Sequence, residues 1–397
     1  MYTPFTSRHF VGYTDPVSGH KIAVLATRMA PVQQGIYFIN SGASDDHRYL
    51  WFTCAYPPAL PHSAAVIDFL TDEIHQFPET TGGSGWLVEG STGNLYWGCA
   101  QGIYMRTLHP QSEPVLIARL PEAVRKLGAG CDIAHLTFTP DKKELIVDFQ
   151  TVQGSLIGSV QISTGEFTQW YHTEPGTNYN HSQCCPVDGN VAMCAHELWN
   201  SLKNCNDPVL VDGIYPRLQI ITRDGTRTML KPYGNGATHE WWAPDGKSVY
   251  YINPNVRDSG VGVVVQDRLD GSEPEVICQC STPGAFNSLW HGHCSKDEQY
   301  FVVDGAYPCM GQPIWRGTES MVYFHNRVTG NTVKFLTRNP VVEGWTPEFP
   351  CPYHIDPHPR FIMDDQFISF TTTVMGRVDL AIAEVKPLIE ATGSHAT

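Results

Sequence analysis

The sequence predicts an all-β protein folded as a single seven-bladed β-propeller, and three observations lead to this prediction. The 397 residues include 35 Gly and 29 Pro, with 11% aromatic and only 17% charged residues, a composition typical of short strands and tight turns. A turn-and-strand unit recurs roughly every 50 residues. The last copy of this unit lacks a turn and strand, and a matching turn and strand lie near the N-terminus. Two stacked β-sandwiches explain neither the repeat nor the displaced strand.

Each copy of the repeat begins with a polar turn placed just ahead of an apolar strand. The seven turns lie at Asp45, Gly93, Asp141, Asp188, Asp245, Asp297 and Asp364. Between them, a second turn leads into another strand, as in "ISTGEFTQWY" and "RVTGNTVKFL". Each unit therefore holds about four short strands joined by tight turns, which is the signature of a propeller blade.

The seventh copy ends before reaching its own second turn and strand. A matching piece, "DPVSG" followed by "HKIAVLA", begins at Asp15. A ring whose last blade is completed by the N-terminal strand has no exposed sheet edge at the junction. We therefore expect one domain over residues 1–397, with residues 1–28 closing the last blade.

The net charge, the lack of long apolar segments and the cysteine spacing indicate which partners, location and cysteine chemistry to expect. The net charge of −14 argues against nucleic acid or an anionic membrane as a partner, because both attract basic surfaces. The chain shows no apolar segment of signal-peptide length and no 18-residue apolar run, so we expect a cytoplasmic protein, or an exported one if the sequence is a mature form. The twelve cysteines contain no CxxC pair, and buried free thiols are expected. Cys309 and Cys351 are the pair to check for a disulfide.

Five histidines occupy nearly the same place in five consecutive units. They stand six or seven positions ahead of the turn, and they are His135, His181, His239, His291 and His358. The first strand of a propeller blade is innermost, so these imidazoles should converge from five directions on one end of the channel. A single histidine in such a place is usually a core residue. Five at one repeat position favour a transition-metal site, a general base or both.

More polar residues accompany two of these histidines. His354 and Asp356 precede His358, and His293 follows His291 by two residues. Because side chains two residues apart on a strand point to the same face, these pairs are expected on one side.

Trp241 and Arg217 are two further candidates near this face. Trp241 follows His239 and offers a flat surface on which a sugar ring can stack, although packing between blades explains it equally well. Arg217 follows a long insertion and can bind a carboxylate with its forked guanidinium. An isolated arginine is more often a simple surface charge.

The quoted repeats resemble the oligogalacturonate lyases, a family of seven-bladed propellers with a manganese site. The resemblance covers nearly the whole chain and is most specific in "THEWWAPDG", "HGHCSKDEQYFVVDG", "PRLQIITRDG" and "DPHPRF". It implies β-elimination on short α-1,4-linked galacturonides. It places the family's catalytic histidine on His239 and its active-site arginine on Arg217.

The resemblance also implies a metal site, and here the chain departs from the family pattern. The implied ligands are His291 and the residues of a Gln-x-x-His-x-His motif, whose last histidine is His358. The other two motif positions hold Tyr353 and Asp356, so His354 or His293 would have to replace the glutamine. An aspartate favours a harder cation. We therefore expect a divalent ion, with manganese first and calcium as the alternative.

The implied reaction is β-elimination, with His239 as the base at C5 and Arg217 and the metal ion neutralising the uronate carboxylate. The expected metal ligands are His291, His358, Asp356 and His354. Residues expected to bind a short anionic oligosaccharide are His135, His181, Trp241, Tyr353 and His293. Two alternatives remain: a lyase acting on another uronate, such as glucuronate linked to rhamnose, and a non-catalytic sugar-binding or scaffold propeller.

Overall fold

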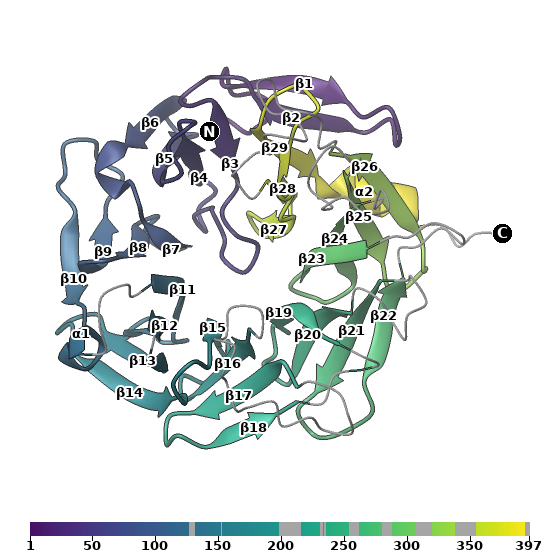
Figure 1. Ribbon diagram of the computed structural model, residues 1–397. Helices are drawn as coiled ribbons and strands as arrows, with labels where there is room; N and C mark the ends of the chain where they lie inside the picture. The colour runs from purple at the N-terminus through teal and green to yellow at the C-terminus, as the bar shows by residue number, and fades with distance from the viewer. Residues whose placement is uncertain are drawn as a thin grey trace.

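Seven antiparallel β-sheets are arranged as the blades of a ring (Figure 1). The computed structural model describes residues 1–126, 132–151, 153–197, 216–230, 233, 236–253, 262–279, 288–306, 320–337 and 355–393. Six sheets have four strands and the seventh has five. The predicted seven-bladed β-propeller is confirmed.

The strands fall into four positions from the axis outward. The innermost are β3 (Val32–Gln34), β7 (Ser84–Val88), β11 (Asp132–Phe138), β15 (Tyr179–Cys184), β19 (Thr238–Trp242), β23 (Ser288–Cys294) and β27 (Arg360–Ile362). The second are β4 (Tyr49–Ala55), β8 (Leu95–Cys99), β12 (Glu144–Thr151), β16 (Val191–His196), β20 (Ser248–Asn253), β24 (Tyr300–Ala306) and β28 (Phe367–Thr372). The third are β5 (His62–Asp68), β9 (Gly102–Arg106), β13 (Gly154–Gln161), β17 (Leu218–Thr222), β21 (Val263–Arg268), β25 (Ser320–Asn326) and β29 (Asp379–Glu384). The outermost are β6 (Glu73–Phe77), β10 (Val115–Arg119), β14 (Phe167–His172), β18 (Arg227–Met229), β22 (Glu275–Gln279), β26 (Thr332–Leu336) and β2 (Lys21–Leu25), beyond which lies β1 (Phe10–Thr14).

The aspartates of the repeat close the turn between the first and second strands of a blade. The carboxylates of Asp141, Asp188, Asp245 and Asp297 each accept the backbone N–H two residues further along, at 2.9–3.2 Å. This side-chain contact mimics a backbone turn. It explains why the motif precedes the second strand of each of these blades.

Glycines perform the corresponding task in the outer hairpins. Gly165, Gly225 and Gly330 have φ angles of 72°, 86° and 76°, a left-handed conformation that glycine adopts without steric cost. They stand in the turns before β14, β18 and β26, where the sequence places the second recurrent turn.

The N-terminal segment closes the ring, as the sequence predicts. Strand β2 pairs with β29 through the antiparallel register Ile22↔Ala383 to Val24↔Ala381, and β1 adds a fifth strand outside it. The turn between β1 and β2 is also tied to the neighbouring blade, because the buried carboxylate of Asp15 accepts the N–H of Leu336 at 2.9 Å. Closure therefore uses two N-terminal strands and a bond to β26.

The hydrophobic core consists of clusters between adjacent blades. One such cluster joins Trp241 and Tyr250 of β19 and β20 to Phe301 and Tyr323 of β24 and β25. Burying a large apolar side chain of this kind contributes roughly 1.5–3 kcal/mol to the free energy of unfolding. Inter-blade packing therefore holds each innermost strand in place around the axis.

Three short helical segments complete the described chain. They are η1 (Pro78–Thr80), α1 (Glu122–Lys126) and α2 (Val385–Thr392). Val385 and Leu388 of α2 belong to the cluster that contains Phe324 and Phe335. No helix in the part of the chain that the structure describes is long and apolar enough to span a membrane.

The described cysteines are free thiols. Six of them are buried, namely Cys54, Cys184, Cys185, Cys194, Cys278 and Cys294, and Cys99 is half-buried. The pair Cys309 and Cys351 lies outside the described residues.

Candidate active site

A β-bulge interrupts the innermost strand of each of four blades at the predicted histidine. The pairing register shifts between Ile133 and Leu136, Asn180 and Gln183, Thr238 and Trp241, and Leu289 and Gly292. The histidines inside these shifts are His135, His181, His239 and His291. A bulge sets two residues against one and re-aims a side chain. This repeated irregularity brings the imidazoles to the axis.

Three of the five histidines adopt a left-handed backbone conformation. The φ angles of His181, His239 and His358 are 56°, 52° and 47°. For a residue with a side chain this conformation costs about 1–2 kcal/mol, and such strain clusters at functional sites. The histidine positions can be read from the sequence, but no residue type at these positions predicts a left-handed backbone conformation.

The five imidazoles form two groups of adjoining rings. The ring centroids of His239 and His291 lie 4.2 Å apart, as do those of His291 and His358. His135 and His181 are separated by 4.4 Å. The structure therefore brings together all five residues, which we call the histidine layer.

Tyr37 joins the two groups and was not identified from the sequence. Its ring packs against those of His135, His181, His291 and His358 at 4.9–5.9 Å between centroids. Burial, followed by the charge of Glu240, raises the pKa of the Tyr37 phenol well above its usual range. The phenol is therefore held in its protonated form.

Tyr37 belongs to a segment between β3 and β4, residues 35–40, which we call the plug (Figure 1). The side-chain amide of Asn40 anchors it by donating to the carbonyl groups of Trp86 and Leu136 at 2.9 and 3.0 Å. The Phe38 ring is fully buried and lies 5.3 Å from His291 and 6.4 Å from Trp241. Only the long connection after a three-residue strand could have hinted at this insertion.

Three side chains at one side of the histidine layer form a possible metal site. Ligand atoms of His291, Asp356 and His358 all lie within 4.8 Å of one another. His291 and Asp356 are buried, with 3% and 8% exposure. Two imidazoles and one carboxylate form a donor set that suits a divalent transition metal and leaves further coordination positions open.

Asp304 on β24 orients two of these three residues. Its carboxylate lies 3.0 Å from Nδ1 of His291 and accepts the backbone N–H groups of His291 and His358 at 2.8 and 3.0 Å. A proton on Nδ1 directed at the carboxylate leaves the Nε2 lone pair of His291 available to a metal ion. The residues present therefore fit a divalent ion.

Arg217 lies in a buried ion-pair network rather than alone on the surface. Its Nη1 is 2.6 Å from Glu197, and its Nε is 3.3 Å from Glu240. Burial would raise the pKa of Glu240, but the Arg217 charge and the His181 contact hold it at about 2. Glu240, which the sequence did not single out, thus connects Arg217 to His181, whose Nδ1 is 3.4 Å away.

His239 lies between the metal-site residues and this network. Its Nδ1 is 3.0 Å from the hydroxyl of Thr238, and its ring lies 5.6 Å from Trp290. Burial, followed by the neighbouring His291 and Arg217, holds its pKa well below the usual value. The imidazole is therefore neutral near pH 7, the state that a proton acceptor requires.

Two residues expected to bind substrate lie in another part of the channel. Trp241 is only 2% exposed and shares a core cluster with Phe301 and Tyr323 of the next blade, so it packs between blades. His293 and Trp241 both line a cavity of about 380 Å³ on the other side of the plug. Two residues along a strand span about 6.6 Å. The side chains of Trp241 and His293 therefore lie beyond Phe38 as seen from the histidine layer. The expectation that both face the histidine layer is corrected accordingly.

Two other expected site residues, Tyr353 and His354, lie outside the described residues. Their proposed parts in the metal and substrate sites remain predictions. His135 and His181, by contrast, adjoin Tyr37 at the histidine layer.

No protein-family model matches the chain. An oligogalacturonide lyase of Pectobacterium atrosepticum is 26% identical over 207 residues, which cover 50% of this chain and 48% of that protein. An oligogalacturonate lyase of Dickeya dadantii is 24% identical over 404 aligned positions, covering 95% and 96% of the two chains. The resemblance to oligogalacturonate lyases therefore extends over nearly the whole sequence.

Solved structures agree on the fold. An oligogalacturonate lyase in complex with manganese superposes with a TM-score of 0.70 at 20% identity, covering 94% of this chain and 96% of the other. The oligogalacturonate lyase of Vibrio parahaemolyticus gives a TM-score of 0.71 at 17% identity, with 95% and 96% covered. At this level of identity the likeness shows a shared propeller.

Proposed function

We propose that this protein is a carbon–oxygen lyase that cleaves short uronate oligosaccharides by β-elimination, with oligogalacturonides as the substrate class. The observation that carries the proposal is the position of His239 beside both the His291–Asp356–His358 cluster and the Arg217 network. The names of the two curated relatives support it. A scaffold propeller has no need of histidines with a strained backbone at its axis.

The reaction requires removal of the weakly acidic C5 proton from a 4-linked uronate. His239 is the proposed acceptor of this proton, because its imidazole adjoins His291 and lies near enough to Arg217 to feel its charge. Arg217 would bind that carboxylate through the N–H groups that Glu197 and Glu240 leave available, and the two glutamates fix its orientation. A guanidinium that is already oriented stabilises developing charge without reorganisation.

Departure of O4 requires a proton donor, and Tyr37 is the residue that we assign to this step. A phenol is protonated at neutral pH and can donate its hydrogen. The Tyr37 ring lies between the two groups of histidines, so a sugar bound at this layer would contact it. The leaving oxygen would gain the phenol proton while the C5 proton passes to His239.

The cluster of His291, Asp356 and His358 would hold the divalent ion. Manganese is our first candidate because a carboxylate ligand suits it and because an oligogalacturonate lyase of the same fold is in complex with manganese. Bound there, the ion would supply positive charge to a substrate carboxylate. The residues themselves define the site, since Asp304 fixes His291 and the backbone of His358. Calcium is the alternative, favoured by the carboxylate of Asp356.

Incubation with a panel of uronate oligosaccharides tests the proposal. Elimination creates a C4–C5 double bond that absorbs in the ultraviolet, so absorbance growth on oligogalacturonides is the expected result. Growth only on rhamnose-linked glucuronate would change the substrate class. No growth on any uronate, with manganese or calcium present, would leave a binding protein as the better explanation.

A further inference from the structure

The strands of the histidine layer also form a second layer of side chains, two residues further along. The residues two positions after the five histidines are Thr137, Gln183, Trp241, His293 and Arg360, and all five line the cavity of about 380 Å³. This volume lies within the range of roughly 300–1,000 Å³ typical of small-molecule sites. The cavity is a separate space, since Phe38 of the plug stands between it and the histidine layer.

Arg360 gives this cavity a positive charge. Its Nη1 donates to the carbonyl of Phe38, and its Nε is buried without a hydrogen-bond partner. Within the described part of the chain, no carboxylate oxygen lies within 4 Å of the guanidinium. A guanidinium is always charged in proteins, and buried charges are normally paired. Arg360 is thus available for an external anion.

A second nitrogen atom beside the cavity also has no partner. Nδ1 of His293 is buried without a hydrogen-bond partner, and its ring lies 6.3 Å from that of Phe361, which follows Arg360 in the chain. Buried polar atoms left without partners usually mark a missing water, ion or ligand. Because His293 and Arg360 both line this cavity, one ligand could satisfy both nitrogen atoms.

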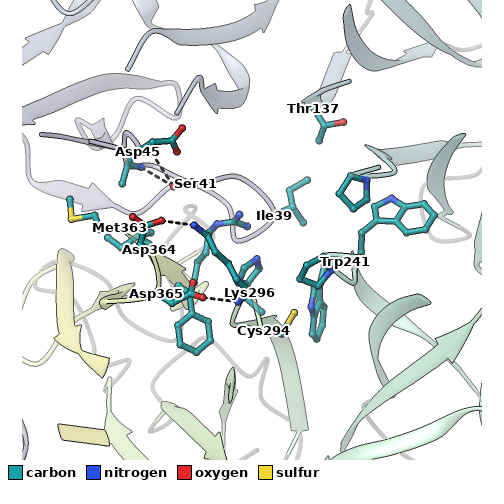
Figure 2. Close-up of a pocket in the computed structure, with 18 of the residues that line it drawn as sticks. Ile39, Ser41, Asp45, Thr137, Trp241, Cys294, Lys296, Met363, Asp364 and Asp365 are labelled. Carbon is teal, nitrogen blue, oxygen red and sulfur yellow. Dashed lines mark hydrogen bonds and ion pairs between the residues drawn. The ribbon is translucent and has the colours of Figure 1, made fainter. Parts of the chain in front are cut away.

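The mouth of the cavity restricts the charge of that ligand. Figure 2 shows Asp45, Asp364 and Asp365 around the opening, together with Lys296. Lys296 contacts Asp364 through its Nζ at 2.5 Å and Asp365 through its backbone N–H at 2.6 Å. Three carboxylates against one lysine repel a multiply charged anion such as phosphate. The opening therefore repels a multiply charged anion more strongly than a singly charged one.

The walls indicate an organic ligand. Trp241, Trp242, Phe361 and Ile39 line the cavity, and Figure 2 shows Trp241 and Thr137 on the side opposite the acidic residues. Trp241, Trp242 and Phe361 are 2%, 9% and 3% exposed, so they give the cavity apolar walls and not a stacking surface. We propose that this cavity binds a small organic monocarboxylate, up to the size of a sugar acid, with Arg360 holding the carboxylate.

Calorimetric titration of the full-length protein tests this site without any measurement of turnover. The probes are D-glucuronate, its uncharged counterpart D-glucose and inorganic phosphate, in buffer with EDTA. Wild type is expected to bind glucuronate and neither of the other two. Phosphate binding as tight as that of glucuronate would mean an adventitious ion only, and would contradict the proposal.

Variants separate this cavity from the histidine layer. Arg360→Gln should weaken glucuronate binding about ten- to a hundredfold, the effect of losing one charge-assisted hydrogen bond, while Arg217→Gln should leave this binding intact. Arg377→Gln, in the same blade, is the matched control. If Arg360→Gln does not fold, as judged by circular dichroism, Arg360→Lys keeps the charge without the fork and should still weaken binding. Unchanged affinity in the Arg360 variant, or loss of all binding in Arg217→Gln, would overturn the proposal.

Discussion

The two ends of the channel are built from the same five blades and differ in the side chains that these blades present. At the histidine layer, bulged and left-handed backbone presents five imidazoles, and four of them contact Tyr37. Two residues further along, four of the five positions carry different residue types and only one keeps a histidine. A bulge and a step of two residues along the chain are therefore enough to give one scaffold two chemically distinct surfaces.

The plug makes this difference possible. Phe38 has no exposed surface and packs against both His291 and Trp241. A continuous channel would expose both layers to the same solvent and ligands. With the plug in place, each end keeps its own electrostatics, with Arg217 and its two glutamates on one side and Arg360 on the other.

Both ends depend on ring closure, so removing the closing strands should have the largest effect. Deleting residues 1–27 removes β1 and β2 and exposes the edge of β29. We expect insoluble protein or a large fall in melting temperature, measured by calorimetry and size exclusion. Asp15→Ala, which removes only the bond to Leu336 and local turn contacts, should cost about 1–3 kcal/mol. A truncated chain that melts like the full-length protein contradicts closure.

Removing the imidazole of His239 from the histidine layer should reduce catalysis. His239→Ala should lower kcat on oligogalacturonides by about 10²–10⁴, the range for a general base, with metal content unchanged. His172→Ala, on the outermost strand β14, is the matched control and should retain full activity. Near-normal turnover in His239→Ala would show that another group accepts the proton.

Asp356 tests whether the metal site belongs to the histidine layer. Asp356→Ala removes one of three donors, so bound metal and activity should fall together to the level of chelator-treated protein. Asp356→His keeps three donors and should retain metal. Elemental analysis of protein purified without added metal or chelator provides the measurement. Full activity in chelator would mean that the side chains alone neutralise the carboxylate.

Tyr37 is the residue that the plug adds to the site. Tyr37→Phe keeps the ring packing but removes the hydroxyl, so kcat should fall by roughly 10² if the phenol protonates O4. The loss should shrink for a synthetic substrate whose leaving group is more acidic than a sugar hydroxyl. An equal loss on both substrates would assign Tyr37 a structural role instead.

Asp304 should have the smallest of these effects, and it acts through other residues. Asp304→Asn keeps the size of the side chain but weakens its hold on His291, and should lower metal affinity by about 10–100-fold. Asp148 is the matched control, because it occupies the corresponding strand β12 and accepts the N–H of Ser182 in the next blade at 2.8 Å. Asp148→Asn should cost comparable stability and leave metal affinity unchanged, as titration calorimetry can verify.

The ring of seven blades follows from the amino-acid sequence alone. Seven Asp- or Gly-containing turns set the spacing of the second strands, because an aspartate carboxylate closes its turn through local contacts. The displaced "DPVSG" piece predicted closure for the same reason. The histidine positions also followed from the repeat, since they are fixed relative to those turns.

The surroundings of the histidines depend on tertiary packing. Tyr37, Glu240 and Asp304 reach the site across blade boundaries or through the plug, and these contacts between residues distant in sequence leave no local pattern. The bulges likewise depend on pairing with a neighbouring strand. A period of two predicts that His293 faces the same way as His291, but cannot show that Phe38 stands between the two levels. The turns depend on contacts between residues that are close in sequence. The division of the channel depends on the packing of distant segments around a shared axis.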